Sequence, residues 1–172
     1  MTLHRLASVT MGVPNVAQTA AYYTEFGLTP QADGWFSTTD GGRQLRIIET
    51  PTRRLVALTV GADHPDDLGR IAHNLTQLDI PFERTTNSIS AIEAATDLHV
   101  TVEVQARITQ ARVAATPYNG PGRLERETCR APGVLRTAAV RPRKLGHAVI
   151  GSTDHAVTQR FFTHGLGFKV SD

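Results

Sequence analysis

One histidine stands in a segment where it could do chemistry. His147 lies within Lys144-Leu145-Gly146-His147-Ala148-Val149-Ile150-Gly151, whose apolar, β-rich composition predicts a strand. An imidazole on a strand can bind a metal ion or carry a proton, although an isolated strand histidine is more often buried and hydrogen-bonded. Residues 145–151 also match residues 6–12 without a gap, and this match sets His147 against Ser8. The sequence thus offers the same strand twice, once with a hydroxyl and once with an imidazole.

The match continues beyond the strand. Later residues align with earlier ones at the same spacing, namely Asp154 with Asn15, Ala156 with Ala17, Thr158 with Thr19, and Phe161-Phe162 with Tyr22-Tyr23. Asn and Asp are both good helix N-caps, so each copy predicts a turn followed by a helix. We therefore expect the chain to begin one strand–turn–helix unit twice.

The remaining candidate groups have plainer interpretations. Glu103 in Val102-Glu103-Val104 is typical of a strand residue that faces solvent or pairs with an arginine. Asp63, Asp66 and Asp67 lack the spacing of a calcium loop and suit the first turn of a helix. Cys129 is the only cysteine, which excludes an intrachain disulfide and a thiolate cluster. No metal spacing such as HxH or HExxH joins the other histidines, which are His4, His64, His73, His99, His155 and His164.

The elements that must position these residues follow a repeating order. We expect strands at 3–11, 35–39, 44–50, 55–60, 82–86, 88–94 and 99–105, with helices after Asn15 and along the apolar stripe Leu68, Ile71, Ala72, Leu75 and Leu78. The order repeats after roughly 50 residues. It predicts two α+β units, about 1–52 and 53–105, that share one curved mixed sheet with helices outside.

The rest of the chain departs from that order. Residues 106–143 are rich in Pro and Gly, so we interpret them as an interdomain linker. Residues 144–172 then start a third unit with a strand at 145–150 and a helix. We expect the chain to be a fragment of a longer protein. The alternative is a complete chain whose last helix packs on another subunit.

Composition bounds the class of protein. The chain has 172 residues, of which 40% are hydrophobic and 20% charged, as in soluble globular proteins. No apolar run reaches the roughly 20 residues that span a bilayer, and the start lacks the form of a secretory signal, so a cytoplasmic location is the default. Residues 106–144 hold nine basic and two acidic residues. We interpret this charge as a solvated linker and expect no nucleic-acid partner.

This arrangement resembles the vicinal oxygen chelate superfamily, and most of all the N-terminal half of the two-domain type I extradiol dioxygenases. The resemblance rests on Arg141-Pro142-Arg143-Lys144-Leu145-Gly146-His147 and on the aromatic pair Phe161-Phe162 followed by Leu166-Gly167-Phe168. It covers the whole chain. It implies four βαβββ modules in the parent protein, with 1–105 as the N-terminal half-barrel domain and 144–172 as the start of a truncated C-terminal metal-binding domain.

The resemblance also implies a site. In the family, iron(II) is held by two histidines and one glutamate, and His147 corresponds to the first histidine. The other two ligands would lie in a fourth module, so we expect no catalytic residue and no cofactor in this chain alone, with Fe(II) in the parent. Ser8 marks a dead site in the first module. Glu103 stands where the superfamily often places its carboxylate, but without a histidine nearby we expect no metal there.

Three functions follow as hypotheses. The first is the N-terminal portion of an iron-dependent extradiol dioxygenase that acts on a catechol-type aromatic and O₂, as a homo-oligomer. The second is a metal-free, antibiotic-sequestering type of binding protein, with Trp35, Phe36 and Phe82 lining a ligand cup. The third is another metal-dependent isomerisation or lyase reaction on the same scaffold.

Overall fold

Two βαβββ units follow one another along the chain, in a computed structural model that describes residues 3–112 and 140–170. The first consists of β1 (Leu3–Val13), α1 (Val16–Glu25), β2 (Thr29–Pro30), β3 (Trp35–Thr38) and β4 (Gly42–Glu49). The second consists of β5 (Arg54–Ala62), α2 (Pro65–Gln77), β6 (Phe82–Arg84), β7 (Ser88–Glu93) and β8 (Leu98–Val104). The expected elements are present with shifts of a few residues at their ends. The sequence did not predict β2 or the short 3₁₀ turn Ala32–Gly34, because both are too short to carry a hydrophobic pattern.

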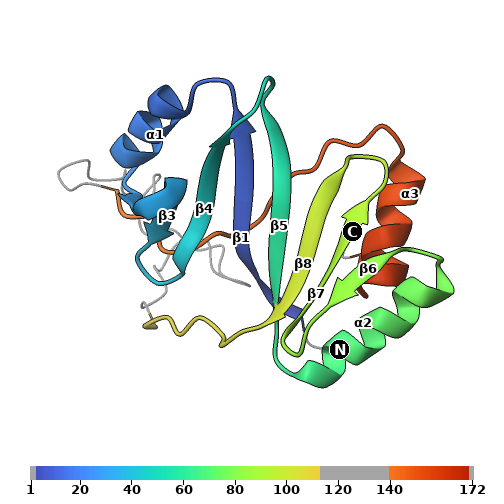
Figure 1. Ribbon diagram of the computed structural model, residues 1–172. Coiled ribbons are helices and arrows are strands. Elements are labelled where there is room, and N and C mark those ends of the chain that lie inside the picture. The colour runs from blue at the N-terminus through green and yellow to red at the C-terminus, as the bar shows by residue number, and fades with distance from the viewer. Residues whose placement is uncertain (1–2, 113–139, 171–172) are drawn as a thin grey trace, which may run out of the picture.

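All eight strands belong to one mixed sheet, in the order β2-β3-β4-β1-β5-β8-β7-β6. Within each unit the first and last strands are parallel, as β1 with β4 and β5 with β8. The two units meet where β1 pairs antiparallel with β5. The strand order is therefore the same when read from either edge toward the centre, and Figure 1 shows the resulting curved sheet with its helices at the two sides. The expected α+β fold of paired βαβββ modules is confirmed.

The core lies between the sheet and its helices. On α2, Leu68, Ile71 and Leu75 are completely buried, which confirms the apolar stripe expected there. They pack in one cluster with alternate residues of the strands, such as Val60 of β5 and Val102 of β8. Each such side chain contributes about 1.5–3 kcal/mol by leaving water. The core is therefore continuous across both units.

The third unit forms its helix but not its strand. α3 (His155–Arg160) starts at the N-cap Asp154, whose carboxylate accepts a hydrogen bond from the backbone N–H of Val157 at 3.1 Å, and it continues into a π-helical turn, η2 (Phe161–Gly165). The expected strand at 145–150 is absent, and residues 168–170 form none either. A strand exists only when a neighbouring strand pairs with it. No described strand pairs with residues 145–150, so this segment is extended but unpaired.

Residues 140–153 cross the molecule from the first unit to the second, as the orange trace of Figure 1 shows. The backbone N–H groups of Thr39 and Asp40 donate to the carbonyls of Pro142 and Arg143, at 3.0 and 2.9 Å. At the far end, the Thr153 hydroxyl donates to the carbonyl of Ala95. Between these points, three apolar side chains pack against the same core as the two helices, namely Leu145, Ala148 and Ile150.

Candidate functional site

His147 lies on the outer side of this crossing segment. It is exposed, as are Gly146 and Val149, whereas the partly buried Leu145 and Ala148 face the core. The sequence led us to expect an imidazole directed into a barrel, and the structure differs. The reason is again the missing pairing, because none of the described strands lies beside residues 145–150 to cover the side of the segment that carries His147.

The matching position in the first unit lies in the middle of the sheet. Ser8 is half-buried between the buried Ala7 and Val9, and it points away from the core because neighbours along a strand alternate. The pairing of the strands places Thr59 beside Ser8, and Thr101 beside Thr59. This row therefore offers three hydroxyls and no imidazole.

Glu103 lies two residues further along β8, and its carboxylate accepts a hydrogen bond from Gln105 Nε2 at 2.6 Å. The sequence suggested a solvent-facing glutamate or one paired with an arginine. In the structure the carboxylate is bonded to the Gln105 amide, and that amide in turn accepts from Arg5. Within residues 3–112 and 140–170, no three His, Cys, Asp or Glu side chains come together as a metal-binding group. Hydroxyls with one engaged carboxylate do not fit a divalent transition metal, so the described donor set by itself does not form such a centre.

The other histidines serve local roles. His64 caps α2, where its Nδ1 accepts from the backbone N–H of Asp66 at 3.2 Å. His73 is exposed on the surface of the same helix. His4 is buried, since its side chain is 2% exposed. Asp67 is also fully buried and pairs with Arg70 on the next turn, which suits the helix-capping interpretation of these aspartates.

A cavity of about 460 Å³ lies at the β6 edge of the sheet. Its lining includes Phe82, Ser90, Ile92 and His99. Of the three aromatic residues expected to line a ligand cup, Phe82 lines this cavity, and Trp35 and Phe36 do not. Phe36 is 3% exposed and belongs to the core, where its ring contacts that of Tyr23.

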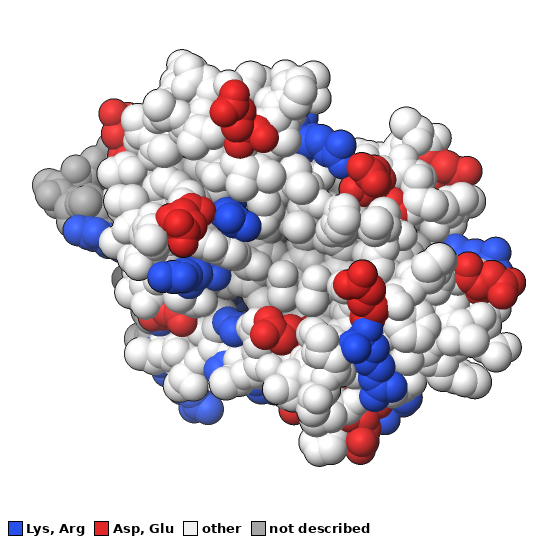
Figure 2. All heavy atoms as spheres, in the orientation of Figure 1, with Lys and Arg blue, Asp and Glu red and all other residues white. Residues whose placement is uncertain are grey.

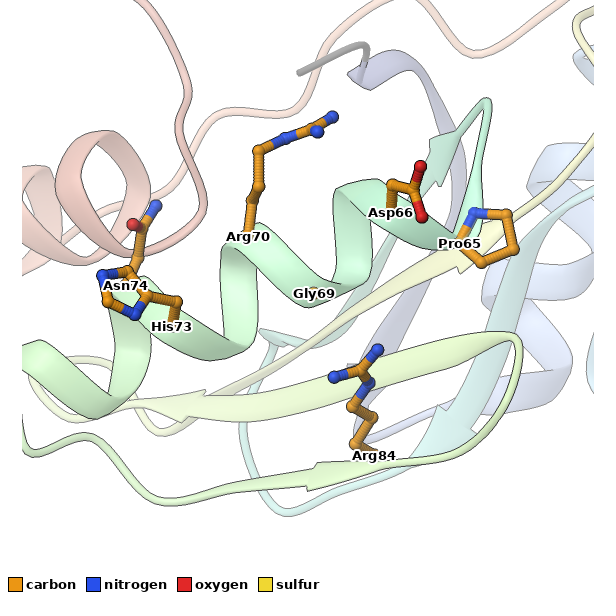
Figure 3. A pocket seen from close by; sticks show the side chains of 7 residues that line it. All are labelled: Pro65, Asp66, Gly69, Arg70, His73, Asn74 and Arg84. Carbon is orange, nitrogen blue, oxygen red and sulfur yellow. The ribbon is translucent and has the colours of Figure 1, made fainter.

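A wider groove of about 600 Å³ runs along the outer side of α2 (Figure 3). Arg70 and His73 project from the helix, and Arg84 reaches toward Gly69 from β6. Figure 3 shows these side chains diverging rather than pointing at a common centre. The groove therefore lacks the convergent polar groups of a binding site.

Gln44 is the polar residue that sequence analysis missed. Its side chain is 1% exposed, and its Nε2 donates to the carbonyls of Leu6 and Ala7. Its Oε1 accepts from the backbone N–H of Leu145 at 2.6 Å and from the hydroxyl of Thr38 at 3.0 Å. The side-chain amide of Gln44, on β4, thus joins β1, β3 and the segment that leads to His147. In the sequence it is one polar residue in a strand, and nothing marks it as buried.

Asp40 forms a second attachment for the same segment. Its carboxylate accepts from Gln110 Nε2 at 2.9 Å and from Arg143 Nε at 2.7 Å. The two hydrogen bonds lower the pKa of Asp40 below its usual value, and the bond from Gln110 has the larger effect. Gln110 and Arg143 lie near the two ends of the expected linker, whose middle, residues 113–139 with Cys129, lies outside the described residues.

The face of the molecule shown in Figure 2 has no single dominant charge. On the face shown in Figure 2, acidic and basic side chains are interspersed. None of the helices in the described part of the chain is both long enough and apolar enough to cross a membrane.

Comparison with known proteins finds solved structures with a similar fold, but no match by sequence to a family model or a curated protein. Among solved structures, the chain is similar to a Mn(II)-bound glyoxalase from Novosphingobium aromaticivorans, with a TM-score of 0.64 and 19% identity, over 98% of this chain and 54% of that one. It is also similar to a halotolerant catechol dioxygenase, with a TM-score of 0.68 and 12% identity, over 98% of this chain and 56% of that one.

A third solved structure extends the likeness. It is the 2,2',3-trihydroxybiphenyl 1,2-dioxygenase of Sphingomonas wittichii strain RW1, with a TM-score of 0.61 and 17% identity, over 98% of this chain and 58% of that one. The chain therefore spans a little more than half the length of each of these three structures. At these identities the likeness establishes the fold.

Proposed function

Starting from a chain that has the vicinal oxygen chelate fold, we propose that it works as the N-terminal part of a metal-dependent enzyme of that superfamily. Within the superfamily we favour an extradiol dioxygenase that uses Fe(II) and O₂ on a catechol-type aromatic. Two of the three structures named above are dioxygenases by their names, and this chain spans little more than half of each. The whole enzyme would then need donors that the described residues do not supply.

The observation that carries this proposal is the repeat of the first unit in the third, which brings a histidine, His147, to a strand position. The third unit repeats the strand sequence and the capped helix of the first, but with an imidazole at the position of Ser8. In the first unit that position lies mid-sheet, because β5 pairs along β1. A fourth unit that paired with residues 145–150 in the same way would enclose His147 beside its own donors. We assign His147 as the first metal ligand of such a site.

In this proposal the two complete units do no chemistry. Their part is to hold the segment that carries His147, through Gln44 to the N–H of Leu145 and through Asp40 to Arg143. Bound iron would supply the positive charge that acidifies a coordinated catechol, and it would let electrons pass from the catechol to O₂. The ring nitrogen of His147 would be one of its neutral donors.

The first test is the reading frame beyond residue 172. The proposal requires it to continue with a histidine at the start of a strand and a glutamate on a last strand. The protein from that frame, and its H147A variant, are then analysed for bound metal and for ring cleavage of catechol. We expect H147A to lose both, and the exposed His164, changed to Ala as the control, to leave both intact. A reading frame that ends at residue 172 would overturn the proposal.

A second candidate function rests on the cavity at the β6 edge. About 460 Å³ is enough for a small aromatic ligand, and Phe82 and His99 offer one apolar and one polar wall. A metal-free binding protein would use this cavity directly. Saturable binding of a catechol to the purified chain, lost in Phe82→Ala and retained in H147A, would favour this function over the first.

A further inference from the structure

A small cavity lies where β1 begins and the crossing segment passes over it. Its volume is about 220 Å³, which is below the usual range for drug-sized ligands. One wall comes from the start of β1, another from the chain just after β8, and the third from the crossing segment. Its lining residues are His4, Arg5, Leu6, Arg107, Ile108, Lys144, Leu145 and Gly146.

Two buried nitrogens in this lining have no partner. The His4 side chain is 2% exposed, and its Nε2 donates to the backbone carbonyl of Gln105 at 3.1 Å, while its Nδ1 bonds to nothing. The Arg5 Nη2 donates to Gln105 Oε1 at 2.7 Å, while its buried Nε–H has no acceptor. The Nε–H of Arg5 is thus a buried donor without an acceptor, which costs about 1–3 kcal/mol. Both unsatisfied atoms belong to residues that line the same cavity.

The cations around the cavity are only partly neutralised. Arg107 is paired with the carboxylate of Asp63, which also lies 3.8 Å from His4 Nε2. Arg5 reaches Glu103 only through the Gln105 amide, which donates to that carboxylate at 2.6 Å. Within residues 3–112 and 140–170, Arg5 and Lys144 form no ion pair. Arg5 thus remains beside the two unsatisfied nitrogens without an ion pair, whereas the charge of Lys144 acts in part on the carboxylate of Asp40.

We propose that this cavity binds a small oxyanion, either a carboxylate or a phosphate group. An oxyanion oxygen would accept the Nε–H of Arg5 beside the His4 ring, with Lys144 completing the charge balance. Charge-assisted hydrogen bonds of this kind are the natural partners of an unpaired guanidinium. The site needs both β1 and the crossing segment, so it forms only when residues 144–146 lie against the sheet. It stands apart from the proposed enzyme function, because none of its residues is a proposed metal ligand.

The test follows the ring signals of isotope-labelled histidines while sodium phosphate, and separately sodium acetate, is added at constant ionic strength. We expect a saturable shift of the His4 signal with at least one of the two anions. Saturation with phosphate alone identifies a tetrahedral oxyanion as the ligand, and saturation with acetate alone identifies a carboxylate. Sodium chloride at the same ionic strength should leave the signal unchanged.

Three variants decide whether the cavity is responsible. Arg5→Gln should abolish binding, and Lys144→Gln, which alters an exposed side chain and preserves the fold, should weaken it about tenfold, as expected for one charged hydrogen bond. Lys169→Gln removes an exposed lysine elsewhere and should leave binding unchanged. No saturation with either anion, or equal affinity in Lys144→Gln and the unaltered protein, would overturn the proposal.

Discussion

Residues 3–28 and 144–168 carry nearly the same pattern and adopt different structures. Both helices start in the same way, because Asn15 Oδ1 accepts from Gln18 N at 2.9 Å and Asp154 Oδ1 accepts from Val157 N at 3.1 Å. The preceding segments differ, since β1 pairs on both sides and residues 145–150 on neither. The comparison teaches that a cap and a helix need only local sequence, whereas a strand needs a partner.

The ends of the two helices differ by one residue. In the first copy the N–H of Leu28 donates to the carbonyl of Tyr23, and in the later copy the N–H of Phe168 donates to that of Phe162. Phe162 aligns with Tyr23, so the later helix end holds one extra residue, which the π-helical turn Phe161–Gly165 accommodates. Both copies then turn at a glycine with positive φ, Gly27 at 98° and Gly167 at 79°. Such a conformation favours glycine.

The aligned aromatic residues have opposite surroundings. Phe161 is 3% exposed, whereas Tyr22 is 59% exposed. Phe161→Ala should therefore destabilise the protein by about 3 kcal/mol, and Tyr22→Ala by well under 1 kcal/mol. Denaturant unfolding with amide exchange of residues 155–166 measures both. Equal effects of the two changes would mean that α3 does not dock as described.

Gln44 of the first unit holds the segment that begins the third unit, through its bond to the N–H of Leu145. Replacing Gln44 should loosen this attachment. Gln44→Leu leaves the N–H of Leu145 without its acceptor, and we expect a loss of about 2 kcal/mol together with faster exchange of that amide. Gln18→Leu changes an exposed glutamine on α1 and serves as the matched control. Unchanged exchange at Leu145 in Gln44→Leu would show that the hydrogen bond does not hold the segment.

The two N-caps should be of equal strength. Asn15→Ala and Asp154→Ala should each weaken their own helix by about 1 kcal/mol. Amide exchange of residues 18–22 and 157–161 reports on the two helices separately. A change that spread from Asp154→Ala to the first helix would contradict the view that caps act locally.

The smallest expected effect is the loss of the Asp40 attachment at low pH. Because the folded pKa of Asp40 is lowered, its hydrogen bonds stabilise the attachment above the usual aspartate pKa, and this stabilisation is lost as the pH falls through the lowered value. Amide exchange at Arg143 should rise in that window, and Asp40→Asn should remove the pH dependence. Asp97→Asn, which alters an exposed pair with Arg54, should retain it. The effect is small because exposed ion pairs contribute little.

The sequence by itself determined the local structure of this protein. The alternation of apolar residues, the caps Asn15 and Asp154 and the stripe on α2 predicted most elements, and the internal repeat predicted two units on one sheet. These signals depend on neighbours within a few residues, so they can be read from the chain alone.

Only the tertiary structure decided which polar residues matter and where the third unit lies. Nothing in the strand pattern distinguished the buried Gln44 from an exposed glutamine, or placed His4 in a cavity. Likewise, residues 145–150 have the composition of a strand, but none of the described strands pairs with them. His147 therefore faces solvent. Burial and pairing depend on residues about 40 to 100 positions away in the chain, and no local pattern specifies them.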